Sequence, residues 1–246
     1  MKRVLLMVAA ALLVLPGAAL ANTITVDFAG NGLYTGLSSK TYGTTVSFPG
    51  ITAYAWFLNS STGNVDPSVL FQRNSPGSGD LGLGVCSEGA STCLGPNGDG
   101  TGTGNWNEIS QLQNQELLSI GLPTGYAWVS VQLSSVDLNL GTNHGPERGW
   151  LVACDSIDPN TASCTVFFQF EGGGNISQIE PVIPIPTAYQ HAAAIFFVPV
   201  DWTGGGNNDN DFLLWKATVT SVPEPATLAL LGMGLGGLLA LRRRKK

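Results

Sequence analysis

Residues 127–140, AWVSVQLSSVDLNL, form a β-strand pattern whose period changes halfway along. Apolar side chains first fall on odd positions and then on even ones: Val129, Val131 and Leu133, followed by Val136, Leu138 and Leu140. Since successive side chains of a strand point to opposite faces, a slip of one residue would turn the second half inside out. We therefore predict a β-bulge at residues 134–135, which returns Val136 to the core face and places Asp137 and Asn139 on the outer face. Two strands joined by a corner are the alternative.

The rest of the chain after residue 21 repeats this β-rich character, with short apolar runs separated by Gly, Asn, Ser and Pro. We predict strands near 23–28, 44–49, 52–58, 69–73, 116–122, 127–140, 149–154, 164–171, 194–202 and 212–222, and a short helical turn only at 107–115. In the last strand, Leu213, Trp215, Ala217 and Val219 are expected on one face. The pattern predicts an all-β fold, a single antiparallel two-sheet β-sandwich of jelly-roll-like type.

The part of the chain from residue 22 to residue 222 is strongly acidic. It holds sixteen acidic residues and four basic ones, which leaves a formal charge of −12. Such a surface disfavours nucleic acid as a partner. It suits divalent cations or simple solubility, and 201 residues are enough for one β-sandwich domain.

Residues 1–21 have the features of a secretory signal peptide. A basic start is followed by twelve apolar residues, a Pro-Gly break and a small-residue triplet that ends at Ala21. An uncleaved membrane anchor is the alternative, but it needs about 20 apolar residues. We therefore expect export through the Sec translocon and cleavage by signal peptidase after Ala21.

The four cysteines fit an oxidising compartment. They form two close pairs, Cys86 with Cys93 and Cys154 with Cys164, and local pairing is the favoured of three connectivities. Each short loop closed in this way should contribute roughly 2–3 kcal/mol. A zinc site would need tighter spacing or histidine partners, and neither His144 nor His191 belongs to such a cluster.

The chain closes with an apolar segment and a basic cluster. Residues 226–241 are sixteen uncharged residues with seven leucines, which as a helix would span about 24 Å, a marginal transmembrane segment. Five cations follow it: Arg242, Arg243, Arg244, Lys245 and Lys246. Because each would cost about 2.5–3.5 kcal/mol at the bilayer centre, we expect this end to stay in the cytoplasm. A permanent tail anchor, or a helix-pairing face through Gly232 and Gly236, is the alternative.

An extended peptide precedes the apolar segment. Pro223 and Pro225 fix two φ angles around Glu224, so the stretch cannot join a helix or a sheet. Extended peptide, short Leu/Gly segment and basic cluster together resemble the C-terminal sorting signal of PEP-CTERM proteins. That resemblance implies an exopolysaccharide-producing diderm bacterium and recognition by exosortase, a membrane protease-transpeptidase that cuts near Pro-Glu-Pro. It divides the chain into a signal peptide (1–21), an exported domain (22–222) and a sorting signal (223–246). The exported part resembles, more loosely, the β-sandwich domain common in such proteins.

One Gly/Asn-rich loop, residues 96–108, carries oxygen ligands of the kind that Ca²⁺ prefers. The candidate ligands are Asp99, Asn105 and Glu108, with Asp137 and Asn139 from the bulged strand. We favour a solvated turn cluster over a calcium site, and the loop does not match the EF-hand pattern. No other cofactor is expected.

Sugar binding is the second interpretation of the domain. Six tryptophans occur, most of them expected in the core, and Trp106 and Trp202 lie in polar loops where an exposed ring can stack on a sugar. A hydrolase is the third, because Glu108, Glu116, Glu171 and Glu180 cannot be paired from sequence and no GxSxG motif accompanies a histidine. The sequence thus favours a non-enzymatic envelope or matrix protein, transiently anchored in the inner membrane and then released to the cell surface or medium. The alternative is a lectin-like matrix protein that binds exopolysaccharide, with or without calcium.

Overall fold

A computed structural model of the chain describes residues 21–29, 33–75, 80–87, 109, 115–136, 147–172, 180–200 and 212–222. Within these ranges the chain forms two seven-stranded sheets and one short 3₁₀ helix, η1 (Thr187–Tyr189). The first sheet contains β1 (Thr23–Asp27), β2 (Leu33–Tyr34), β6 (Val69–Ser75), β7 (Asp80–Cys86), β9 (Tyr126–Ser134), β12 (Ile183–Pro184) and β14 (Leu213–Ser221). The second contains β3 (Ser39–Tyr42), β4 (Ile51–Leu58), β5 (Val65–Pro67), β8 (Glu116–Gly121), β10 (Arg148–Cys154), β11 (Cys164–Glu171) and β13 (Ala194–Pro199).

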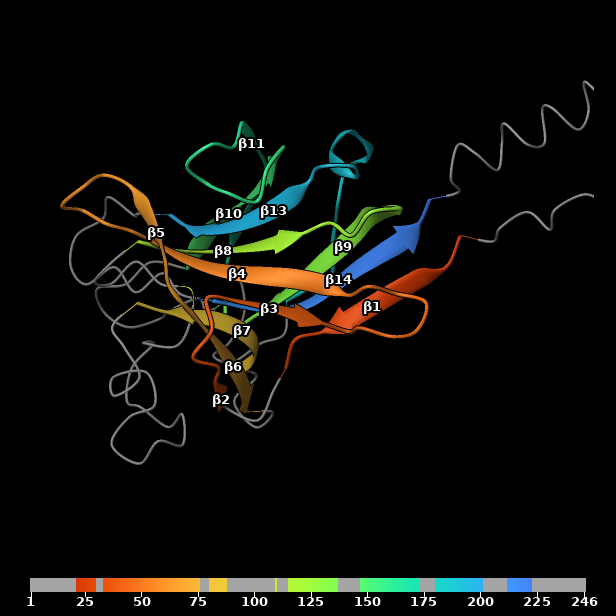
Figure 1. Ribbon diagram of the computed structural model, residues 1–246, viewed down its shortest axis with the longest axis horizontal. Helices are drawn as coiled ribbons and strands as arrows, with labels where there is room; N and C mark the ends of the chain where they lie inside the picture. The colour runs from red at the N-terminus through yellow and green to blue at the C-terminus, as the bar shows by residue number, and fades with distance from the viewer. Residues whose placement is uncertain are drawn as a thin grey trace, which may run out of the picture.

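The strand order is β12-β9-β14-β7-β6-β2 in the first sheet, where β1 also pairs with β14. In the second sheet it is β11-β10-β13-β8-β4-β3, where β5 also pairs with β4. Every strand pair in the described ranges is antiparallel. The chain passes repeatedly from one sheet to the other, as in a jelly roll, and Figure 1 shows the result. The predicted all-β, two-sheet antiparallel sandwich is confirmed.

The core lies between the two sheets. Its side chains come from both, for example Ile51, Leu118 and Phe197 from the second sheet and Leu83 and Val219 from the first, all fully buried. Burying each such side chain stabilises the fold by about 1.5–3 kcal/mol. Alternation along the strands therefore selects one face of each sheet for the core.

Strand β9 follows the predicted inward pattern only in part. Val131, Leu133 and Val136 are buried in the core as expected. The strand ends at Ser134, and Ser135 takes a left-handed conformation with φ 58°, which turns Val136 inward. The predicted interruption at residues 134–135 is thus present, but as a strand end and not as a bulge within a continuous strand, and residues 137–140 lie outside the described ranges.

The register shift in β9 lies earlier, at Val129. Opposite β14, Ser130 pairs with Thr218 and Trp128 pairs with Val219, so Val129 is the extra residue. This shift lets Trp128 share the core face with Val131, and the prediction that Val129 faces the core is wrong. The buried indole explains the shift, because its Nε1–H also finds a partner, the carbonyl of Ala192 at 3.0 Å.

Strand β14 contains a second register shift, at Trp215. Leu214 pairs with Leu133 and Lys216 with Gln132, so Trp215 has no partner in β9. Consequently Leu214, and not Trp215, joins Ala217 and Val219 in the core cluster. The predicted core position of Trp215 is wrong because one inserted residue reverses the side-chain alternation beyond it.

The predicted strand at 44–49 is also wrong. This segment is a loop after β3, where Gly43 has φ 71° and the Thr45 N–H donates to the carbonyl of Phe48 at 2.9 Å. Phe48 still enters the core, with 1% exposure, while Val46 is fully exposed. An apolar side chain inserted from a turn gave the segment its strand-like composition.

The structure adds elements that the sequence pattern did not predict: β2, β3, β5, β7, β12 and η1. Most have two to four residues, too few to show a period. Of the predicted helical turn at 107–115, only Ile109 and Gln115 are described, and Ile109 is buried in the core.

Candidate functional site

The predicted sorting signal and ligand sites lie almost entirely outside the described residues. This applies to Pro223, Glu224 and Pro225, to the basic residues 242–246, and to the candidate calcium and sugar ligands Asp99, Trp106, Asn105, Glu108, Asp137, Asn139 and Trp202. The apolar segment 226–241 and residues 1–20 also lie outside them. No helix in the described ranges is long and apolar enough to cross a bilayer, and no cluster of metal-ligating side chains forms among those residues. The structure instead defines the segments that lead into both predicted processing points.

The two ends of the described chain meet in one strand pair. β1 and β14 run antiparallel with Thr23 opposite Thr220, and both lie at the right of Figure 1. Beyond the last pair, the Asn22 N–H donates to Oγ of Ser221 at 2.8 Å. In return the Ser221 N–H donates to the carbonyl of Asn22 at 2.9 Å. The residue that follows the predicted signal-peptide cut therefore lies beside the last residue of the final strand.

One further hydrogen bond fixes the end of β14. The Val222 N–H donates to the carbonyl of Gly125 at 2.8 Å. Gly125 lies in the turn between β8 and β9 and has φ 81°, a conformation that glycine adopts without strain. The next residue in the sequence is Pro223, which has no N–H to continue the ladder. The predicted sorting motif therefore begins directly after the last hydrogen-bonded residue, with no linker.

Packing against the loop after β3 supports the turn between β8 and β9. Tyr126, the first residue of β9, pairs with Ser221 and donates from its hydroxyl to the carbonyl of Ser47 at 3.1 Å. Its ring meets Phe48 edge to face, with the centroids 5.0 Å apart. Because Phe48 is a core residue, the exit point of β14 is tied to the sandwich.

Side chains also join β1 to β14 on the exposed face. The hydroxyls of Thr25 and Thr218 lie 3.0 Å apart, and Nζ of Lys216 lies 3.7 Å from a carboxylate oxygen of Asp27. The ammonium of Lys216 also lies 3.6 Å from the centroid of the Trp215 ring. Exposed pairs of this kind contribute little individually, so the strand pair depends mainly on its backbone bonds and on Val26, which is 2% exposed.

The predicted disulfide between Cys154 and Cys164 is confirmed, with an S–S distance of 2.06 Å. It closes a loop, residues 155–163, between β10 and the edge strand β11. Cys86 is also disulfide-bonded, and its predicted partner Cys93 lies outside the described residues. A zinc role for the bonded pair is thereby excluded.

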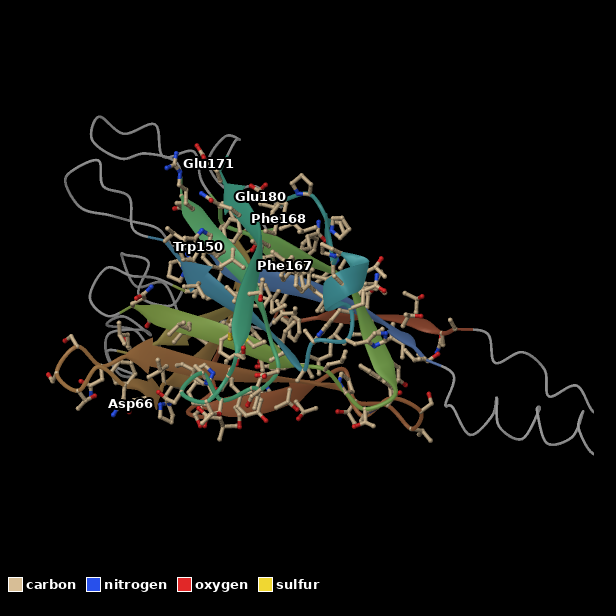
Figure 2. All side chains as sticks on the ribbon, turned by 90° about the horizontal axis from the view of Figure 1, so that it is seen from above. Asp66, Trp150, Phe167, Phe168, Glu171 and Glu180 are labelled. Atoms are coloured by element: carbon tan, nitrogen blue, oxygen red, sulfur yellow. A yellow bond between two sulfur atoms is a disulfide. The ribbon has the colours of Figure 1, made fainter. Side chains whose placement is uncertain are left out.

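Tryptophans are less buried than the sequence analysis predicted. Of the four that the structure describes, only Trp128 is fully buried, and Trp56 and Trp215 are partly buried. Trp150 is 36% exposed on β10, next to the edge strand β11, where Phe168 is also exposed. Figure 2 shows both side chains at this edge.

Two of the carboxylates considered for hydrolysis have structural partners. Glu171 accepts from Nη2 of Arg148 at 3.1 Å, and both groups are partly exposed. Glu116 is 2% exposed and accepts the Ser87 N–H at 2.8 Å. Glu171 thus links β11 to β10, and Glu116 links β8 to the residue that follows β7.

Burial raises the pKa of Tyr42 far above its ordinary value of 10.0. Its hydroxyl has no hydrogen-bond partner in the described part of the chain, and the ammonium of Lys40 lies 5.0 Å from the ring centroid. A phenol in this state stays protonated at neutral pH, so it is a core residue and no candidate base.

A pocket of about 500 Å³ lies on the outer face of the second sheet, the face turned away from the core. Tyr54 and Thr52 of β4 line it together with Thr41 of β3, Thr124 of the β8–β9 turn and Ile157 of the disulfide loop. Sequence reasoning missed this site. The available signal was the alternation in residues 51–56, where Ile51, Ala53 and Ala55 face the core and the residues between them face outward.

Residues 221–245 match the family model for the PEP-CTERM protein-sorting motif. No curated protein and no solved structure matches the chain. The matched motif is the recognition signal of exosortase. It implies export, a membrane-anchored step and then display at the cell surface.

Proposed function

We propose that this chain is a non-enzymatic cell-envelope or extracellular-matrix protein whose β-sandwich stays outside the cell after exosortase removes its C-terminal signal. In this proposal signal peptidase cuts after Ala21, the apolar segment 226–241 holds the chain in the inner membrane, and the basic residues 242–246 stay in the cytoplasm. The match to the sorting motif supports the exosortase step, and the proposal adds a role for the β-sandwich domain.

The strand pair β1–β14 carries the proposal. It brings Asn22 and Ser221 into direct hydrogen-bond contact, so both membrane-directed segments leave the sandwich at one end. A domain joined to the bilayer in this way can fold outside the membrane while both ends of the precursor remain inserted. Both cuts then fall outside the core, because the outermost core residues of these two strands are Val26 and Val219.

The proposal predicts that cleavage leaves the domain intact. The last described hydrogen bond before the motif is made by Val222, one residue before Pro223. Removal of the residues that follow takes no strand residue from β14. A released sandwich is therefore expected to be as stable as the precursor's.

The absence of catalysis is part of the proposal. Glu171 is paired with Arg148, and Glu116 accepts a backbone N–H from Ser87, so each carboxylate already serves the fold. The runner-up role, saccharide binding, is favoured by the pocket beside Tyr54 and is developed below.

The test follows the chain in an exosortase-positive host and in the same host lacking exosortase. We expect the chain in the medium or at the surface in the first and in the inner-membrane fraction in the second. A Glu224→Ala variant should be retained in the membrane, whereas Glu171→Ala, which changes a carboxylate on β11, should be processed normally. Equal surface display with and without exosortase would contradict the proposal.

A further inference from the structure

The pocket on the outer face of the second sheet, named here the outer-face pocket, contains one ring with an open side. Tyr54 stacks on Trp56 with their centroids 6.1 Å apart and their planes at 15°. The pocket is lined by Tyr54 and Thr52 but not by Trp56, so it lies on the side of Tyr54 away from the indole. Tyr54 thus presents a ring that is supported on one face and free on the other.

Trp56 is itself held in place. Its Nε1–H donates to Oγ of Ser119 on the neighbouring strand β8 at 2.8 Å, and Ser119 is fully buried. The indole also packs against the apolar cluster that Phe196 and Val152 form on this face. Because its support is fixed, Tyr54 loses little conformational freedom when a ligand covers it.

Two threonine hydroxyl groups form the floor of the pocket beside the ring. Oγ1 of Thr41 and Oγ1 of Thr52 lie 2.8 Å apart and share one hydrogen bond. Whichever hydroxyl donates in that bond, the other keeps its own hydrogen, and both keep an unused lone pair. Thr124 lines the same pocket and adds a third residue with a hydroxyl group. The floor can therefore both donate to and accept from a ligand hydroxyl.

A second wall of the pocket comes from the loop between β10 and β11, which is held in place before any ligand binds. Residues 155–163, named here the strap, begin at the disulfide between Cys154 and Cys164. At the other side, Nδ2 of Asn160 donates to the carbonyl of Val65 at 2.8 Å, and Oδ1 accepts the Val65 N–H at 3.0 Å. Ile157 of the strap lines the pocket. Fixation at both points lets the strap hold its position without a ligand.

Among the residues that the structure describes, no charged side chain lines the pocket, although the protein has a formal net charge of −6. An anionic group buried there would have no cation to compensate for its lost water. The chemistry selects a neutral, hydroxyl-rich ligand with an apolar face that can cover an aromatic ring. A hexose or pentose ring has both properties, and a volume of about 500 Å³ falls within the usual range of roughly 300–1,000 Å³ for small-molecule sites.

We propose that the outer-face pocket binds one sugar unit of a neutral polysaccharide, with the ring stacked on Tyr54 and its hydroxyls bonded to Thr41, Thr52 and Thr124. This site differs from the loop tryptophans that the sequence suggested. It is independent of the sorting signal, so a chain that exosortase never cuts would still bind.

The test uses the purified full chain in a polyoxyethylene detergent, because detergents with sugar head groups would compete. Affinity electrophoresis through gels containing dextran, galactomannan or xylan measures binding to neutral polysaccharides, and alginate serves as the acidic comparison. We expect retardation by at least one neutral polymer and none by alginate. No retardation by any of the three, or equal retardation by alginate, overturns the proposal.

Variants locate the site. Tyr54→Ala should raise the dissociation constant about tenfold. Trp150→Ala removes an exposed aromatic from the same sheet but outside the pocket, and should bind as the parent does. Equal losses in the two variants would overturn the assignment.

A filling variant covers the case in which Tyr54→Ala fails to fold. Gly121 lines the pocket, and a Cβ there would meet Ile157 and the Thr52 carbonyl at an ordinary 3.7 Å. Gly121→Gln should therefore keep the fold and place a neutral side chain in the pocket, abolishing retardation. A folded Gly121→Gln chain that is still retarded overturns the proposal. The same variant should still be processed by exosortase and reach the surface normally. Loss of sugar binding can therefore be distinguished from a failure of sorting.

Discussion

Replacing Val26 by Ala tests the claim that β1 is an integral part of the sandwich and not a loose leader. Val26 is 2% exposed, pairs with Ala217 and belongs to the core cluster. Its Cγ2 occupies the space beside Gly43, since a Cβ built on that glycine would lie only 2.7 Å away. The Val26 side chain therefore contacts the loop after β3. Since β3 belongs to the second sheet, Val26 connects the two sheets.

The expected loss can be estimated from that packing. Val→Ala removes two buried methyl groups, worth about 1.6 kcal/mol in transfer free energy. The cavity left behind adds to this, which gives about 2–3 kcal/mol in the free energy of unfolding. For a domain of this size the melting temperature should fall by about 5–10 °C. Circular dichroism of the purified chain during heating measures the shift.

Thr25→Ala is the matched control, because Thr25 lies on the same strand with its side chain exposed. It loses one surface hydrogen bond, to Thr218, and the melting temperature should change by at most about 2–3 °C. Equal shifts in Val26→Ala and Thr25→Ala would refute the reasoning, since the burial of β1 would then contribute nothing to stability.

Three further outcomes are expected. A Cys154→Ala, Cys164→Ala double variant should lose about 2–3 kcal/mol of unfolding free energy in a denaturant titration, because the closed loop is short, and an unchanged midpoint would contradict this. The folded-state pKa of Tyr42 lies above its unfolded value of 10.0, so the stability that its protonated form provides is complete below pH 10 and falls as the pH rises above 10. Tyr42→Phe should remove that part of the loss of stability at alkaline pH. Identical curves of stability against pH for parent and variant would contradict this prediction. A chelator should leave the melting temperature unchanged if residues 96–108 are a solvated turn cluster, whereas a lower melting temperature would support the calcium alternative.

The sequence predicted the position of several of the longer strands. β4, β8, β10 and β11 all lie within one residue of their predicted bounds. In β4 the buried and outward side chains alternate, so one face decides the conformation, whereas the other three were recognisable as short apolar, β-rich runs bounded by polar or glycine-containing segments. The pairing of Cys154 with Cys164 followed from sequence distance alone.

Side-chain direction could not be predicted where the partner strand sets the register. Trp215 and Val129 are the extra residues of two shifts between β14 and β9, and neither is marked by Gly or Pro. At Trp215 the bulged backbone approaches β7 so closely that a Cβ on Gly82 would overlap the carbonyl of Leu214. The need for glycine at residue 82 depends on a contact about 130 residues away, which no local pattern contains.

The functional residues also differ in how far the sequence could predict them. The sorting motif is a contiguous peptide, so its residues were recognisable one after another. The outer-face pocket is assembled from β3, β4, the β8–β9 turn and the strap, which are distant in sequence. Only the outward positions of β4 carried a signal, and without the strand order they could not be joined to Thr124 or Ile157.

The central claim is that the tail after Val222 is a temporary membrane handle, removed at the point where the strand pair β1–β14 ends. Intact-mass measurement of the surface or extracellular form tests it most directly, because one spectrum reports both termini. The account predicts a chain that begins at Asn22 and ends near Pro223–Pro225. A mass that still includes residues 242–246 would contradict it.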